Sequence, residues 1–208
     1  MIVTLDGQRL DEPHTADGTL QELVDHVRDS HARERLIVSV SVNGTRLGDA
    51  ELDAHLPQAI PGDAQVDLET GDRIVLVRDA LRGLAAEFDE AVGRHAEVAD
   101  RLAAGEIESA MRDVAGLLEV WQTCQRALAQ CGGLLGEDLT QRTYDGRPVN
   151  AHLEDVIGRL GELRQALQDN DAVLLGDLFR YELPPLCETW GRLLASVAEE
   201  VGAEASGA

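Results

Sequence analysis

The spacing of the apolar residues changes near Gly71, and this change constrains the fold more than any other feature of the chain. Before that point, Leu36–Val42 alternates valines with serines at a period of two, which is typical of a β-strand. After it, apolar residues from Ile74 to Leu102 recur in alternating steps of three and four, which predicts one long amphipathic helix with a heptad-like seam. The sequence therefore predicts an α+β chain in which a small mixed sheet precedes a set of helices.

Turn and capping signals divide the first 72 residues into short elements. Asp6-Gly7 and Asn43-Gly44 are dipeptides that favour two-residue hairpin turns. Thr19 followed by Glu22 is a capping box, so we expect one helix that begins at Leu20 and ends near Ser30. The expected strands are Met1–Leu5, Arg9–Asp11, Leu36–Val42, Thr45–Leu47 and Gln65–Thr70, with a short helical turn at Ala50–Leu56.

The remaining residues predict an antiparallel bundle of four to five helices, because apolar stripes of helical period alternate with short breaks. Helix breaks are expected at Ala104-Gly105 and Gly132-Gly133, and a loop at Gly136–Arg147. A helix is expected to start at Pro148, and a short helix follows at Ala172–Tyr181. The proline pair Pro184-Pro185 either interrupts that short helix or starts the last helix. The expected domains are thus 1–72 and 73–202, followed by a disordered tail at 203–208.

The segments VTLDG, SVSVNG and QVDLET lie at the start, middle and end of the first 72 residues, and together they resemble a β-grasp, or ubiquitin-like, module. Ubiquitin-like modifiers and sulfur carriers end in an exposed Gly-Gly, whereas here the module continues into a helix and the chain ends in Ser206-Gly207-Ala208. The resemblance therefore implies a scaffold without conjugation chemistry. The helical part, around Asp171–Leu186 and Trp190, resembles the C-terminal segment of uncharacterised bacterial proteins of the same layout.

The charge of the chain limits the classes of partner. Its 39 acidic residues outnumber 18 basic ones, all of them Arg, and the formal net charge is −21. Such a surface repels phosphate backbones and anionic lipid, so we expect no nucleic-acid or membrane binding. The absence of Lys excludes a Schiff-base lysine from this chain. Without a long apolar run or an export signal, the chain is expected in the cytoplasm, where its three cysteines would stay reduced.

Cysteine and histidine side chains are the candidates for chemistry, and each has a structural alternative. Cys124 and Cys131 are two helical turns apart, about 10.5 Å, which is too far for a disulfide. They are interpreted as buried thiols, or alternatively as a redox or metal pair completed by Cys187. His95 lies in the seam of the first long helix, either as a core histidine bonded to a neighbouring helix or as a group that tunes a helix interface with pH. The other histidines, His152 included, are expected in loops or on polar faces.

Half of the six aromatic residues, namely Phe179, Tyr181 and Trp190, fall within a short segment near the C-terminus. One interpretation is that they pack the last two helices together around the proline pair. The other is a surface that binds a partner, because Tyr, Trp and Arg are favoured as interface anchors. The candidate partner-binding residues are Phe179, Arg180, Tyr181 and Trp190.

No catalytic, cofactor-binding or metal-binding motif is recognisable, so we predict a non-enzymatic bacterial adaptor that binds a protein partner, with a basic surface as one option for that partner. A homodimer through exposed seam residues of Arg73–Leu102 is a further candidate. The alternative functions are an export or assembly chaperone, since acidic bundles resemble flagellar secretion chaperones in general character, and a redox protein that uses the three cysteines.

Overall fold

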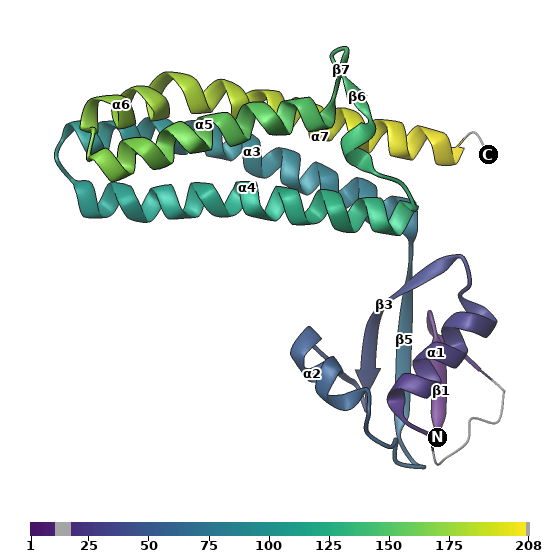
Figure 1. Ribbon diagram of the computed structural model, residues 1–208. Coiled ribbons are helices and arrows are strands. Elements are labelled where there is room, and N and C mark those ends of the chain that lie inside the picture. Colours follow the sequence, from purple (N-terminus) through teal and green to yellow (C-terminus); the bar gives the residue numbers. More distant parts are fainter. Residues whose placement is uncertain (11–17, 207–208) are drawn as a thin grey trace. The chain divides into compact units, whose positions relative to one another are not determined.

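The computed structural model describes residues 1–10 and 18–206 (Figure 1). They form an α+β fold, which confirms the predicted fold class, and they divide into two compact units, Met1–Leu76 and Val77–Ala208. We call these the sheet unit and the helical unit. The first holds a mixed five-stranded sheet with a helix packed against it, and the second holds several helices.

The sheet has the strand order β2-β1-β5-β3-β4. The central pair, β1 and β5, is parallel with Val3 opposite Val66, and every other pair in this sheet is antiparallel. The strands and helices of the unit are β1 (Ile2–Leu5), β2 (Gln8–Arg9), α1 (Leu20–His31), β3 (Arg35–Val42), β4 (Thr45–Arg46), α2 (Asp49–His55) and β5 (Gln65–Asp72). The predicted strand Arg9–Asp11 overlaps β2 only at Arg9: the strand begins one residue earlier, Leu10 lies beyond its end, and Asp11 lies outside the described residues.

The local signals in this unit act as the sequence predicts. Asn43 and Gly44 both have positive φ, 52° and 78°, the conformation that a tight two-residue hairpin requires. At the start of α1, the Thr19 hydroxyl accepts a hydrogen bond from the Glu22 amide, and the Glu22 carboxylate accepts one from the Thr19 amide at 2.9 Å. Both the hairpin and the capping box are confirmed.

One face of the sheet and one face of α1 enclose the core of this unit. Figure 1 shows α1 lying across the sheet near β1 and β5. Alternate strand residues point inward, as the period of two requires, and meet the stripe of α1. The buried apolar side chains of this core are those of Val3, Leu20, Leu23, Val27, Val40, Ile60, Ala64, Val66 and Leu68.

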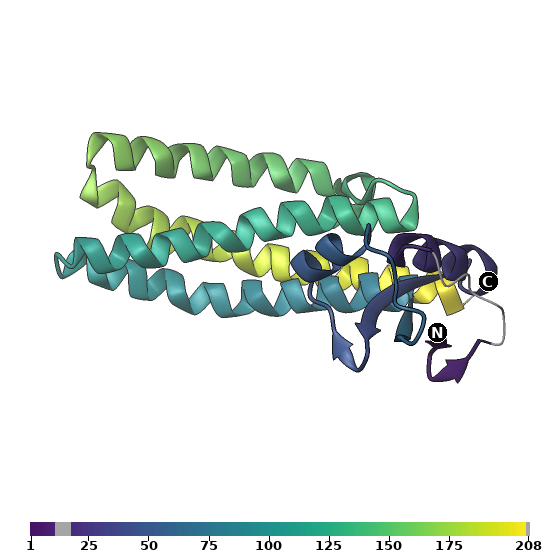
Figure 2. The ribbon, with the colours of Figure 1, turned by 90° about the horizontal axis from the view of Figure 1, so that it is seen from below.

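The helical unit is built from long antiparallel helices, which Figure 2 shows running lengthwise beside one another. Pairs of contacting residues show the direction, because Arg82 contacts Glu199 whereas Asp100, further along α3, contacts Arg180. The elements are α3 (Arg73–Ala103), α4 (Ile107–Leu135), a 3-10 turn η1 (Leu139–Gln141), β6 (Thr143–Tyr144), β7 (Arg147–Pro148), α5 (Val149–Asp169), α6 (Ala172–Asp177), a π-helical segment η2 (Leu178–Glu182) and α7 (Leu183–Ser206).

The seam of α3 faces the inside of its own chain. Phe88 is fully buried, His95 is 1% exposed, and the rest of the seam from Val77 to Leu102 is buried with them. The helices that follow in the same chain cover the seam from Val77 to Leu102. A homodimer through exposed residues of Arg73–Leu102 stays a prediction, and it would have to use other positions of this helix, such as Val75, which is 40% exposed.

Helix α4 continues past the glycine pair that was expected to stop it. It ends at Leu135, and Gly136, with a φ of 75°, forms the left-handed C-cap. Gly132 is needed for close approach instead, because a Cβ atom at this position would lie 2.6 Å from the Glu137 carbonyl oxygen. The segment expected as a loop contains η1, whose Leu139 is buried, and the small hairpin β6–β7.

The proline pair lies in the first turn of the last helix, because α7 begins at Leu183, so the expectation that the pair starts this helix is confirmed. Helical backbone runs without a break through α6, η2 and α7, so the predicted helix end at Tyr181 is wrong. The Leu183 amide donates to the Leu178 carbonyl, five residues back, in the wider π turn. Proline lacks an amide hydrogen and its ring crowds the carbonyl four residues earlier, and the π turn accommodates Pro184 and Pro185 at this point.

The predicted disordered tail is corrected over its first part, because α7 extends to Ser206. Arg142 in the loop after α4 donates to Glu204 at 2.8 Å and also pairs with Glu200 and Glu137. This contact holds the last turns of α7, which composition alone assigned to a tail. Residues 207–208 lie outside the described residues.

Candidate functional site

Three aromatic rings form the centre of the helical unit. The ring of Trp121 lies edge-on to that of Phe88 with centroids 4.5 Å apart, and also to that of Trp190 at 5.9 Å. Such edge-to-face pairs add stability beyond the area that they bury. The indole Nε1 of Trp190 is buried and has no hydrogen-bond partner among the described residues. Packing of the rings therefore outweighs the cost of one unpaired donor here.

Of the predicted partner-binding residues, Phe179 and Trp190 are each only 1% exposed. They pack in the core, so the prediction that they anchor a partner is corrected in favour of the packing interpretation. They are buried because both lie on the side of the continuous helix that faces α3 and α4. Arg180 and Tyr181, which directly follow Phe179, face outward, and Arg180 pairs with Asp100 at 2.5 Å.

His95 is a core histidine with polar partners on its own helix and on a neighbouring one, where Nε2 lies 4.0 Å from the Cys187 sulfur of α7. Its Nδ1 lies 2.6 Å from the Ala91 carbonyl oxygen, one turn back, and its ring centroid is 5.9 Å from that of Phe179. Burial lowers the pKa of the ring below its usual value of 6.5, and the nearby charge of Arg94 acts in the same direction. His152, expected on a polar face, is also buried and lies 3.1 Å from the Tyr144 carbonyl oxygen.

The three cysteines are buried free thiols. Burial raises the pKa of Cys124 and of Cys187 to about 12, and it also raises that of Cys131. Thiolate is the reactive form in redox exchange and in metal binding. At neutral pH these side chains are therefore small apolar groups of the core, which argues against the redox alternative.

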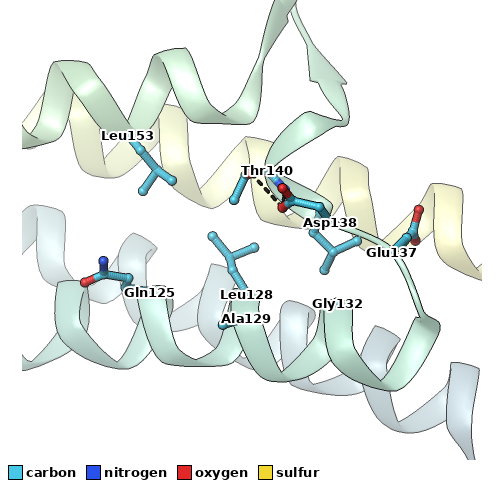
Figure 3. Close-up of a pocket in the computed structure, with 9 residues that line it drawn as sticks. Gln125, Leu128, Ala129, Gly132, Glu137, Asp138, Thr140 and Leu153 are labelled. Carbon is cyan, nitrogen blue, oxygen red and sulfur yellow. Dashed lines mark hydrogen bonds between the residues drawn. The ribbon is translucent and has the colours of Figure 1, made fainter.

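A groove of about 410 Å³ opens between α4, η1 and α5 (Figure 3). Gln125 and Leu128 rise from α4 on one side, and Leu153 reaches down from α5 on the other. The turn at Asp138–Thr140 closes one end, where the Asp138 carboxylate accepts hydrogen bonds from the Thr140 amide and hydroxyl. These bonds lower the pKa of Asp138, so its carboxylate remains ionised over the physiological range.

The same seam between α4 and α5 continues toward the other end of the two helices. A second, very small cavity of about 10 Å³, the size of one water molecule, has Leu118, Trp121 and Leu160 in its wall. Ile157 lies one turn from Leu153 and one turn from Leu160, so it is on the same side of α5 as both. Its side chain is 66% exposed. Ile157 lines neither the groove nor the small cavity, and it stands exposed on α5 between the two leucines that line them.

The structure offers no cluster of three or more His, Cys, Asp or Glu side chains that could hold a metal ion within residues 1–10 and 18–206. In the same part of the chain, no helix combines the length and apolar character needed to cross a membrane.

Residues 79–193, more than half of the chain, match the model of a family described as a domain of unknown function, DUF8042. The chain belongs to the DUF8042 family. The matched residues begin within α3 and end within α7, so they contain α4, η1 and α5 completely.

The DUF8042 chain is also similar to an "Uncharacterized protein" from Treponema pallidum (strain Nichols). The two are 25% identical over 194 residues, which cover 89% of this chain and 92% of the relative. A match of this length includes residues from both the sheet unit and the helical unit. No solved structure matches the DUF8042 chain significantly.

Within the DUF8042 segment, the groove between α4 and α5 is the feature that sequence reasoning missed. The apolar stripes predict core positions throughout, and periodicity alone does not say which stripe residues remain uncovered. One signal was available, because Ile157 stands outside the regular steps of three and four that join Leu153 to Leu167. An isoleucine outside the buried stripe is a reason to suspect an exposed apolar position.

Proposed function

We propose that this protein is a non-enzymatic adaptor that binds an amphipathic helix of a protein partner in the groove between α4 and α5. The observation that carries the proposal is Ile157, 66% exposed and flanked on α5 by the two leucines that line the groove and the small cavity. An amphipathic helix that lays its apolar face in such a groove is a recurring mode of protein recognition.

The length and chemistry of the groove favour a helix as the ligand. Leu153, Ile157 and Leu160 follow one another at steps of four and three, which is the spacing of a ridge on a helix surface. On α4, Leu118 and Gln125 lie on the flank that faces this ridge. A third helix placed over two antiparallel ones buries its own apolar stripe against both.

Charge supports a partner with basic residues beside its apolar stripe. Residues 73–208 carry 24 acidic residues and 13 Arg, a difference of 11 negative charges. At the closed end of the groove the carboxylate of Asp138 is ionised and exposed, and Glu154 is exposed on α5 nearby. Opposite charges at the rim of an interface steer association and set the direction of the bound helix.

The sheet unit supports a scaffold role in the same proposal. Its order β2-β1-β5-β3-β4, with a parallel central pair and α1 packed on one face, supports the assignment to the β-grasp fold and is consistent with a module that presents surfaces without carrying out chemistry. A cytoplasmic location belongs to this proposal as well, since the buried thiols suit a reducing compartment.

Site-specific photocrosslinking in living cells tests the proposal. A photoreactive amino acid at position 157 is expected to give a discrete adduct with one protein, whereas the same amino acid at Val173, which is 76% exposed on α6, is expected to give none. Leu118→Glu, across the groove, should abolish the adduct at 157 while the variant stays folded by circular dichroism. Equal adducts at both positions, or an adduct that survives Leu118→Glu, would show that the groove is not the binding site.

A further inference from the structure

The sheet unit has an edge that its own strands cover at one end only. The edge strand β4 is two residues long and pairs with Ser41 and Val42 of β3. The ladder ends where the Leu47 amide donates to the Val40 carbonyl at 2.9 Å. Before Val40, β3 has no strand neighbour on this side in the part of the chain that the structure describes.

An apolar groove of about 470 Å³ lies beside this uncovered edge. Its walls come from α1, β3, the segment after β4, and α2. The apolar residues that line it are Val24, Ile37, Val38, Val40, Leu47, Leu52 and Leu56. Most of these side chains are partly buried against the core of the sheet unit, so the groove opens directly onto that core. Val38 at its edge is 43% exposed.

We propose that this edge and groove bind an extended segment of a partner protein as an added strand. An extended chain fits both features together, because its backbone can pair with the open side of β3 while every second side chain enters the groove. A helix would fill the groove but leave the backbone of the edge strand unpaired. This inference goes beyond the function proposed above, since it uses a different unit and a different mode of recognition.

The surrounding residues define the chemistry of the added segment. Arg46 and Asp49, of opposite charge, stand at the groove, so the rim selects no net charge. The groove itself selects apolar side chains at alternate positions of the ligand. The pairing register between β3 and β5 shifts between Ile37 and Ser39, and such a bulge bends a strand and shortens the edge available for pairing. The ligand is therefore a short segment of about five residues.

A displayed library of random peptides of about 12 residues, selected against the full-length protein, tests this inference. The enriched peptides are expected to share apolar residues at alternate positions. A synthetic copy of one of them should slow hydrogen exchange at the amides of β3 near Val38 and Val40. Enrichment of no common pattern, or of a pattern with helical spacing, would overturn the proposal.

Matched substitutions test whether the peptide binds at the edge of β3 and in the groove beside it. Val38→Lys and Leu52→Lys should each weaken its binding by about tenfold or more, because both residues line the groove. Ile2→Lys, at a residue of similar exposure (40%) on β1, should leave the affinity unchanged. Circular dichroism shows whether each variant is folded, and Leu52→Lys in α2 keeps the test available if Val38→Lys unfolds. Equal binding by the two groove variants and the control would also overturn the proposal.

Discussion

The imidazole Nε2 of His95 on α3 lies 4.0 Å from the thiol sulfur of Cys187 on α7, and both side chains are buried. In a catalytic pair the two groups would share a proton as thiolate and imidazolium. Here burial favours the neutral form of each, lowering the pKa of His95 and raising that of Cys187 to about 12. The contact is therefore one between two neutral core groups, and it has consequences for pH dependence and for reactivity.

Acid should destabilise the helical unit through His95. The folded state holds the pKa of this ring below 6.5, so between the two pKa values the unfolded chain binds more protons than the folded one. The free energy of unfolding then falls as pH drops below about 6.5, by at most about 1.4 kcal/mol per pH unit for one group. In His95→Gln this part of the slope should disappear, as measured by urea unfolding between pH 7 and pH 5. An unchanged slope in the variant would contradict the assignment to His95.

The cysteines should react slowly in the folded protein. With a pKa of about 12, Cys124 and Cys187 are almost entirely protonated at pH 8, and burial also blocks their access to reagents. Labelling by a thiol reagent is expected to be roughly 100-fold slower in native protein than in guanidinium chloride, where all three thiols react at once. Fast labelling of one thiol in the native state would revive the redox alternative.

Sequence patterns were most reliable where a local rule decided the structure. The Asn43-Gly44 hairpin depends only on backbone sterics, and the Thr19–Glu22 capping box depends only on two side chains three residues apart. The period change near Gly71 likewise reports which faces of the elements are buried. For these features, the residues of the local segment are sufficient to determine the structure.

Prediction failed where a distant contact decided the outcome. Trp190 and Tyr181 are both aromatic and close in sequence, yet one is 1% exposed and the other 63%, because nine residues of continuous helix place them about half a turn apart, and the predicted helix end at Tyr181 hides this relationship. The helical end of α7 similarly depends on Arg142, more than fifty residues earlier in the chain. Composition near the terminus carries no information about that partner.

Removing the Arg142 side-chain charge should loosen the end of α7. The Arg142 side chain is 12% exposed, and its guanidinium contacts Glu204, Glu137 and Glu200, of which the first two hold its pKa above the usual value. Because these carboxylates are more than one-third exposed, solvent screens the pairs, and Arg142→Met should cost roughly 1–2 kcal/mol of stability. Hydrogen exchange should accelerate over residues 198–206. Arg112→Met, at a well-exposed pair with Glu108, is the matched control and should change little.

The two adjacent glycines of α4 should respond to alanine in opposite directions. At Gly132 a Cβ atom would lie 2.6 Å from the Glu137 carbonyl oxygen, and this backbone atom cannot move without displacing the turn that closes the groove. At Gly133 nothing lies within 4 Å of the added atom. Gly132→Ala should therefore lower the free energy of unfolding by about 1–3 kcal/mol, the usual cost of overpacking.

Gly133→Ala should instead raise the free energy of unfolding by about 0.5–1 kcal/mol, because alanine restricts the unfolded chain and favours helix. Chemical denaturation of the two variants beside the parent protein measures both effects. The comparison also bears on the binding groove, since the displaced turn contains Asp138 and Thr140. A crosslink at position 157 that persists in Gly133→Ala and is lost in Gly132→Ala would place the partner against this turn, whereas equal stabilities of the two variants would show that the close approach at Gly132 does not exist.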